Sequence, residues 1–252
     1  AKTVHAHSPG LAKRESALTL SRMVHFTLFG IPVYIRPSFW VVLAIFGGAL
    51  SISSVEDLIY PALFVIAGFV AILSHEMGHA LVGRKLGGGQ QTIVLELFGG
   101  LTSSHGMQLT RGGRALMILA GPMMTLLLGI ISLWLTWNIV APVMTSYNLN
   151  FWDLAISPFT AALISPKLYI LSCLIMIGEW WTILNLLPIY PLDGGQLIAQ
   201  YIRSPRKVFM TGFITAILIG LLSFQLFHGY FIPIFMALFA YSNYREYKNA
   251  PF

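Results

Sequence analysis

The sequence predicts an all-α polytopic membrane protein with about six transmembrane helices and short membrane-associated β-hairpins. Three observations support this fold class. Hydrophobic residues make up 56% of the 252 residues and charged residues only 10%, whereas a soluble domain carries about 25% charged residues. Apolar runs of roughly membrane-spanning length recur along the chain. The Lys and Arg residues flank these apolar runs mainly on one side of the predicted membrane.

The amino-terminal part of the chain is expected to lie outside the membrane or on its surface. Residues 1–22 are polar and hold no long apolar run, so we expect a polar leader and no secretory signal peptide. From Phe26 to Arg36 apolar residues alternate with others, and Gly30 and Pro32 interrupt the run. This pattern predicts a short hairpin that lies against the membrane.

A second β-prone segment, Thr92 to Thr102, follows the Gly-rich link 87–89 and is too short to cross a membrane as a helix. Its Gly99-Gly100 pair predicts a turn and therefore a second hairpin. Lipid-exposed sheet edges are not tolerated in hydrocarbon, so this hairpin must be buried in protein or line a wet cavity.

The remaining apolar runs are expected to form helices within a single membrane domain, residues 1–252. Pro188 and Pro191 should stop or unwind the fourth of these helices. The run from Val208 to Tyr244 is too long for one span, and His228-Gly229 is the expected turn within it. The six expected spans are 37–54, 60–82, 114–138, 167–188, 207–227 and 230–244.

The distribution of charge predicts an orientation for these spans. With the amino terminus in the cytoplasm, fourteen of the fifteen Lys and Arg residues fall on the cytoplasmic side and only Lys167 on the other. Both termini are then cytoplasmic, at the cytoplasmic membrane if the source is a prokaryote. Because this bias accounts for the net charge of +6, we expect the lipid bilayer and not a nucleic acid as a partner.

The second span carries the motif His75-Glu76-Met77-Gly78-His79 in its last third. Residues four apart on a helix share a face, so the two imidazoles can bind one metal ion, and Glu76 borders that face. Ionisable groups within a span are costly and indicate a functional site. Two His ligands beside a carboxylate are typical of zinc hydrolases.

A catalytic zinc ion usually has three protein ligands, and Asp193 is the best candidate for the third. It follows the proline-broken end of the fourth span at a depth similar to that of the histidines, and Gly194-Gly195 permits tight backbone packing behind it. The only cysteine is Cys173, so a Cys-based metal site is excluded. The sequence therefore predicts one Zn²⁺ bound by two histidines and an aspartate.

These motifs resemble the site-2 protease family of intramembrane zinc metalloproteases. The family carries a His-Glu-x-x-His helix, here 75–79, and an Asn-x-x-Pro-x-x-x-x-Asp-Gly motif, here 185–194. Further similarity lies in Phe29-Gly30-Ile31-Pro32-Val33, in Phe98-Gly99-Gly100 and in Gly121-Pro122. Thr125 departs from the pattern, because many members have Asn there. The resemblance covers nearly the whole chain and is that of a compact bacterial or archaeal-type member.

The resemblance implies an intramembrane zinc endopeptidase acting in regulated intramembrane proteolysis. Its substrate would be a single-span membrane protein cleaved within the transmembrane segment, while the oligomeric state stays undefined. His75, His79 and Asp193 would bind the zinc ion. Glu76 would take a proton from an activated water and deliver it to the leaving amine.

The same resemblance implies how a substrate is held. Asn185 would donate a hydrogen bond to the substrate or to the developing oxyanion. The hairpins offer strand edges for an unwound segment, which makes Phe98, Gly99 and Gly100 the expected substrate-binding residues beside Asn185.

Other interpretations of these residues stay open at this point. A membrane metal transporter would use intramembrane His and Asp but would not need Glu76 beside His75. A catalytically inactive scaffold would usually have lost Glu76 or a ligand. Asp193 would alternatively cap a helix end. Asn185 would alternatively form a hydrogen bond to a neighbouring helix. Glu179, expected to be buried in the fourth span, would pair with a backbone group or line a water path.

Overall fold

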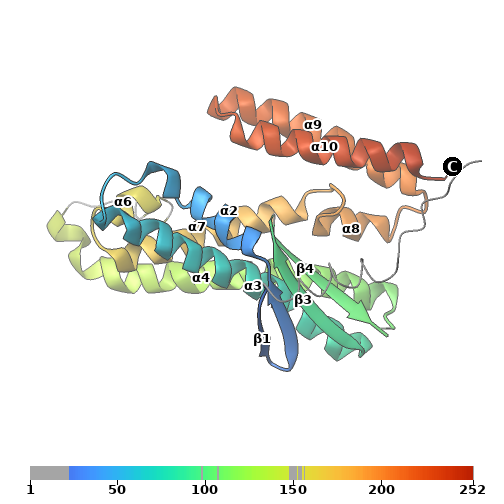
Figure 1. Ribbon diagram of the computed structural model, residues 1–252, viewed down its shortest axis with the longest axis horizontal. Helices are drawn as coiled ribbons and strands as arrows, with labels where there is room; N and C mark the ends of the chain where they lie inside the picture. The colour runs from blue at the N-terminus through green and yellow to red at the C-terminus, as the bar shows by residue number, and fades with distance from the viewer. Residues whose placement is uncertain are drawn as a thin grey trace, which may run out of the picture.

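The computed structural model describes residues 23–97, 99–106, 108–147, 152, 155 and 157–251, so the leader expected at 1–22 lies outside the described residues. Long helices form most of the chain (Figure 1). α3 (Ile59–Gly87), α4 (Arg111–Tyr147) and α7 (Pro166–Leu186) form a bundle with a small sheet at one end (Figure 1). α9 (Pro205–Phe227) and α10 (Phe231–Asn249) form an antiparallel pair beside this bundle (Figure 1).

Both expected hairpins are present, and they join into one sheet. β1 (Val24–Leu28) and β2 (Ile31–Ile35) are antiparallel around Phe29-Gly30, whose φ angles of 50° and 75° fit a two-residue type I′ turn. β3 (Gln90–Glu96) and β4 (Gly99–His105) form the second antiparallel pair. Because β2 lies parallel to β3, the strand order is β1-β2-β3-β4.

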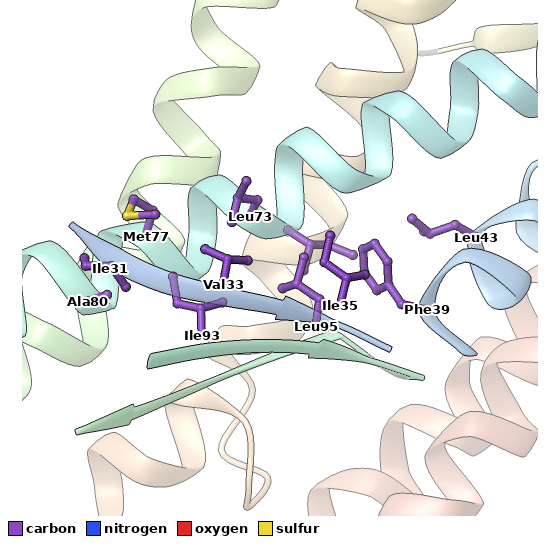
Figure 2. Close-up of a cluster of buried hydrophobic side chains, with 11 residues drawn as sticks. Ile31, Val33, Ile35, Phe39, Leu43, Leu73, Met77, Ala80, Ile93 and Leu95 are labelled. Atoms are coloured by element: carbon purple, nitrogen blue, oxygen red, sulfur yellow. The ribbon is translucent and has the colours of Figure 1, made fainter. Parts of the chain in front are cut away.

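One face of this sheet is apolar and packs against α3 (Figure 2). Side chains alternate along a strand, so Ile31, Val33 and Ile35 of β2 share a face with Ile93 and Leu95 of β3. None of these five is more than 2% exposed. The rest of the cluster comes from helices and consists of Phe39, Leu43, Ile72, Leu73, Met77 and Ala80. Burial of each large side chain contributes about 1.5–3 kcal/mol, which fixes the sheet against the turns of α3 that carry the histidine motif.

The first expected span, 37–54, is wrong as a continuous helix. α2 (Pro37–Phe46) has 10 residues, and at 1.5 Å per residue it is about 15 Å long, half of the roughly 30 Å hydrocarbon core. Its C-cap is Gly47, and Gly48 has a left-handed φ of 88°, a conformation that favours glycine and ends a helix. Two short 3₁₀ helices, Ala49–Ser51 and Glu56–Leu58, then lead into α3.

Among the described residues, four helices are long and apolar enough to cross a membrane, so the chain is a mostly helical integral membrane protein. They overlap the second to fifth expected spans almost completely. The count of six is not confirmed, because α2 is short and polar residues fill the last part of α10. The four segments are Glu56–Gly87, Arg111–Ala141, Pro166–Leu186 and Pro205–Leu226.

Glycines let the three bundle helices approach closely. Gly78 of α3 lies against the carbonyl of Ala120 in α4, where a Cβ would collide with that carbonyl. Gly178 of α7 lies against the carbonyl of Thr125, and a Cβ at this position would be only 2.9 Å from the oxygen. Small residues at such contacts are the usual means of close helix packing in membranes. They bring the histidine-bearing face of α3 against α4.

The helix break expected at the prolines is present. α7 ends at Leu186, and the short helix α8 (Asp193–Ala199) begins after the segment 187–192. Within that segment Ile189 is fully buried against α9 and α10. The segment therefore connects the end of α7 to the α9–α10 pair.

Candidate metal centre

His75 and His79 lie one turn apart on the buried face of α3. They are only 2% and 8% exposed, and their Nε2 atoms are 3.1 Å apart. Gly121 of α4 makes room for both rings. A Cβ at this position would collide with the His79 imidazole and would lie 2.9 Å from Nε2 of His75. The two imidazoles can therefore converge only because residue 121 has no side chain.

Asp193 reaches the same point from the first residue of α8. Its Oδ2 lies 3.0 Å from Nε2 of His75 and its Oδ1 lies 3.4 Å from Nε2 of His79. A Cβ at Gly194 or Gly195 would collide with the backbone of the segment before it, so these glycines let α8 start directly against the end of α7. The structure thus brings the three expected ligands together, with their ligand atoms all within 4.8 Å of one another.

These three side chains lie close enough together to bind one metal ion. Metal–ligand bonds of about 2.0–2.1 Å in a tetrahedral site place neighbouring ligand atoms roughly 3.3 Å apart. The two Nε2 atoms are 3.1 Å apart, and they lie 3.0 and 3.4 Å from different oxygens of the Asp193 carboxylate. Within the described residues, Oδ2 of Asp193 makes no hydrogen bond of normal geometry. Burial opposes the charge of this carboxyl, but the imidazoles of His75 and His79 outweigh burial and hold the pKa of Asp193 below its ordinary value. The carboxylate is therefore ionised and able to bind a cation.

The other ring nitrogen of His79 fixes its tautomer. Nδ1 lies 2.8 Å from the carbonyl oxygen of Met117. It carries a proton and donates it to this carbonyl, so Nε2 is the nitrogen that is left to bind a metal ion, once it gives up any proton of its own. Two imidazole nitrogens and a carboxylate oxygen form a donor set that catalytic zinc sites use, with a fourth position open. The residues present therefore fit zinc.

Glu76 is buried next to these candidate ligands, and β4 holds its carboxylate. The hydroxyl of Thr102 lies 2.7 Å from Oε2 of Glu76 and donates to it. A Cβ at Gly100 would collide with the same carboxyl group and lie 2.6 Å from Oε1. Thr102 was missed by the sequence analysis. Its role depends on which face of β4 lies against α3, and only the alternation with Gly100 hints at that.

The expected substrate-binding residues have separate surroundings. The side-chain amide of Asn185 is buried and donates to the carbonyl of Trp181, one turn earlier, at 2.9 Å. In the described part of the chain it makes no hydrogen bond to a candidate ligand. Gly99 packs against the indole ring of Trp181, and Gly100 lies over Glu76. Phe98 lies outside the described residues.

Thr125 and Glu179 do not join the candidate ligands. The hydroxyl of Thr125 is fully buried and lies 2.9 Å from that of Thr182. Both hydroxyls also lie within hydrogen-bond distance of the carbonyl of Pro122, so the pair bridges α4 and α7. The expected burial of Glu179 is wrong, because its side chain is exposed on the outside of α7.

An apolar cavity of about 860 Å³ adjoins the turn between β3 and β4. It lies between α2, α3, α7 and the α9–α10 pair. Nearly all of its lining side chains are apolar, and they include Phe39, Phe64, Trp181, Ile219 and Phe235. Gly99 is part of its wall, and the next residue, Gly100, covers Glu76. The cavity therefore reaches the strand that holds the Glu76 carboxylate.

The sequence pattern of peptidase family M50 matches residues 63–227. The chain belongs to peptidase family M50. The matched region contains the histidine motif of α3, the close contacts of α4 and both Asn185 and Asp193. The resemblance to site-2 proteases noted in the sequence is thereby confirmed at the level of the family.

Relatives of this M50 chain are found in archaea and bacteria. It is 29% identical over 227 residues to zinc metalloprotease MJ0392 of Methanocaldococcus jannaschii. The aligned region covers 86% of this chain and 57% of that protein. It is 28% identical over 188 residues to the protein sll0528 of Synechocystis sp. This aligned region covers 70% of this chain and 43% of that protein. The M50 chain therefore spans about half the length of these curated relatives.

The M50 chain also resembles a solved structure, the site-2 protease from Methanocaldococcus jannaschii. The TM-score is 0.56 at 24% sequence identity, and the match covers 89% of this chain and 95% of that chain. At this identity the likeness shows a shared fold.

Proposed function

We propose that this M50 chain is an intramembrane zinc endopeptidase that cleaves a transmembrane segment of a membrane-tethered substrate. One observation carries the proposal. His75, His79 and Asp193 converge with their ligand atoms within 4.8 Å of one another, and the two histidines and Glu76 lie on a helix apolar enough to cross a membrane. The chain's membership of a peptidase family and its similarity to a protein named as a zinc metalloprotease support the proposal. A metal transporter would have no need of a carboxylate held in place by Thr102, so hydrolysis is favoured.

One zinc ion would be bound by Nε2 of His75, Nε2 of His79 and a carboxylate oxygen of Asp193. When bound, zinc supplies Lewis acidity toward a carbonyl oxygen and toward water. The Met117 carbonyl accepts from Nδ1 of His79, which aligns the ring and leaves Nε2 as the nitrogen that would bind the metal. Gly121 keeps the space between the two imidazoles free of carbon atoms.

Glu76 would serve as general base and then as general acid. Its carboxylate takes the proton of the attacking water and returns it to the leaving amine. Thr102 donates to Oε2, which leaves Oε1 as the oxygen that handles the proton. Proton transfer to a positioned group contributes about 10²–10⁴ in rate, so this arrangement is a large part of the expected catalysis.

A substrate segment must unwind before its peptide bond can be attacked, and the sheet offers a place for the extended form. β4 is an edge strand of the sheet, so an extended peptide can add to it by backbone hydrogen bonds. Gly99 and Gly100 begin this strand, and Phe98 precedes them in the sequence. The apolar cavity suits the side chains of a membrane segment. Asn185 would exchange its bond to Trp181 for one to the substrate carbonyl.

We further propose that residues 1–252 form one membrane domain with both termini in the cytoplasm. α10 would return through the membrane beside α9. Residues 37–54 would cross as a broken segment that contains α2 and the 3₁₀ helix Ala49–Ser51, restoring six crossings. Basic residues at the end of α3 and at the starts of α4 and α9 support a cytoplasmic position for the sheet and the metal centre. The only basic residue near the opposite end is Lys167. Water then has a short path to Glu76.

Cleavage by reconstituted protein tests this proposal. The protein is incorporated into vesicles with a single-span model substrate that has a helix-breaking Gly-Pro pair in its span. Wild type should cleave it, whereas Glu76→Gln should keep one zinc ion per chain and lose at least about 100-fold in rate. Equal cleavage by both proteins would refute the peptidase function. Zinc movement across the vesicle membrane without cleavage would support a transporter.

A further inference from the structure

Asn243 of α10 is a buried polar residue that the proposed chemistry does not use. Its side chain is 1% exposed. The amide nitrogen donates to the carbonyl of Phe239, one turn earlier, at 2.9 Å, and to the carbonyl of Tyr190 at 2.7 Å. Tyr190 lies in the segment 187–192, three residues before Asp193. One amide group therefore links the α9–α10 pair to the segment that leads directly to a candidate ligand.

The Tyr190 backbone is enclosed on three sides by close contacts. Asn243 holds its carbonyl oxygen from α10. A Cβ at Gly212 of α9 would collide with Oδ1 of Asn243 and lie 3.3 Å from the backbone nitrogen of Tyr190. A Cβ at Gly195 of α8 would collide with that same backbone nitrogen. Because α8 packs directly on this peptide group, a shift of Tyr190 displaces the helix turn that begins with Asp193.

The amide of Asn243 does not serve stability well. Its Oδ1 is buried and accepts no hydrogen bond within the described residues, and an unsatisfied buried polar group is destabilising. Ile189 already attaches the segment to α9 and α10 through an apolar cluster with Ala216, Met236 and Ala240. An apolar side chain at 243 would remove this unsatisfied oxygen and would deprive the Tyr190 carbonyl of its donor, so the two effects on folding oppose each other. What Asn alone adds is a fixed position for the Tyr190 carbonyl.

We propose that Asn243 is a positioning residue that acts through Tyr190 to hold Asp193 at the metal centre. The α9–α10 pair thereby sets the metal affinity, although it contributes no ligand. Of the three candidate ligands, Asp193 is the one that does not come from α3, so its position depends on this loop. The inference rests on the proposed zinc function, because it takes Asp193 to be a ligand.

The test measures zinc affinity of the purified full chain by competition with a chelator. Asn243→Leu keeps the shape of the side chain and removes its donor and acceptor. It should weaken zinc binding about tenfold, in the range seen when groups behind a ligand are removed, while the unfolding temperature of the metal-free protein changes little, because the relieved Oδ1 and the lost donor oppose each other. Asn243→Asp places an oxygen against the Tyr190 carbonyl oxygen and should weaken binding further.

Two more variants keep the test decisive. Gly212→Ala pushes on the Asn243 amide from α9 and should also weaken zinc binding, and its effect should add little to that of Asn243→Leu, since both act on one contact. Asn138→Leu is the matched control. Asn138 is exposed on α4 and donates to the carbonyl of Trp134 in its own helix at 2.7 Å, so its loss should leave zinc affinity unchanged.

Co²⁺ in place of zinc gives a second readout, because its visible absorption depends on the ligand geometry. A changed Co²⁺ spectrum in Asn243→Leu, with the wild-type spectrum retained in Asn138→Leu, would support the inference. Wild-type zinc affinity in Asn243→Leu would overturn it, as would a loss matched by equal destabilisation of the metal-free protein. The proposed function fails separately, if wild type binds no zinc or if Asp193→Asn leaves zinc affinity unchanged.

Discussion

Replacement of Gly121 by Ala should remove metal binding without unfolding the protein. The added Cβ would lie 2.9 Å from Nε2 of His75 and collide with the His79 imidazole. Both imidazoles would have to turn away, and with them two of the three ligand atoms. Zinc affinity should fall by at least about 100-fold, the upper range for changes behind a ligand, which corresponds to about 2.7 kcal/mol.

The helix itself should tolerate this substitution. Ala is favoured over Gly in a helix by about 1 kcal/mol, and Gly121 lies well inside α4. Gly129→Ala is the matched control, because a Cβ there would meet only the carbonyl of Ile175, at an ordinary 3.9 Å. Zinc affinity is measured by chelator competition and stability by thermal unfolding. If Gly121→Ala bound zinc as tightly as Gly129→Ala, the geometry assigned to the two imidazoles would be refuted.

Three further results are expected. Thr102→Val removes the donor to Glu76, a hydrogen bond to a charged group worth about 1.5–3 kcal/mol. The cleavage rate should fall about 10- to 100-fold at unchanged zinc content, and Thr102→Ser should restore it; a lower zinc content would instead indicate a structural role. Asp193→Asn should lower zinc affinity more than any other change in α8. Equilibrium dialysis measures the affinity, with Gln196→Ala in the same helix as the control. Removal of zinc by a chelator should stop cleavage, and added Zn²⁺ should restore it; cleavage that persists without metal would contradict the account.

The candidate ligands could be found from sequence because local rules fix them. Helical periodicity puts His75 and His79 on one face, and two prolines end the fourth span just before Asp193. Their shared depth followed from the charge bias of the flanking segments. These signals are short-range or apply to whole segments, and a single chain displays them directly.

The surroundings of the ligands could not be found in this way. Thr102 acts on Glu76 and Asn243 acts on Tyr190 across 26 and 53 residues of sequence. Such pairs depend on tertiary packing, which has no periodicity along the chain. Gly121-Pro122 was noticed as part of a family pattern, but its physical reason, space for two imidazoles, appears only in the packing of α3 on α4.

The errors in the predicted fold also come from tertiary contacts and local backbone geometry that a hydrophobicity pattern does not display. Two hairpins were expected separately, and the parallel pairing of β2 with β3 that joins them spans the whole of α2 and α3. The expected first span treated Gly47-Gly48 as part of an apolar run, although Gly48 has the left-handed φ that ends α2. Hydrophobicity predicted that residues 37–54 are apolar, but the two glycines decide where the helix ends.

Mass spectrometry of the cleavage products in H₂¹⁸O tests the central claim most directly. The account predicts a cut within the apolar span of the substrate and one ¹⁸O atom in the new carboxyl terminus, since Glu76 activates water for the attack. The same product should be nearly absent with Glu76→Gln, whose zinc content should be unchanged. A cut confined to the segments outside the membrane, or the same labelled product from Glu76→Gln, would contradict the account.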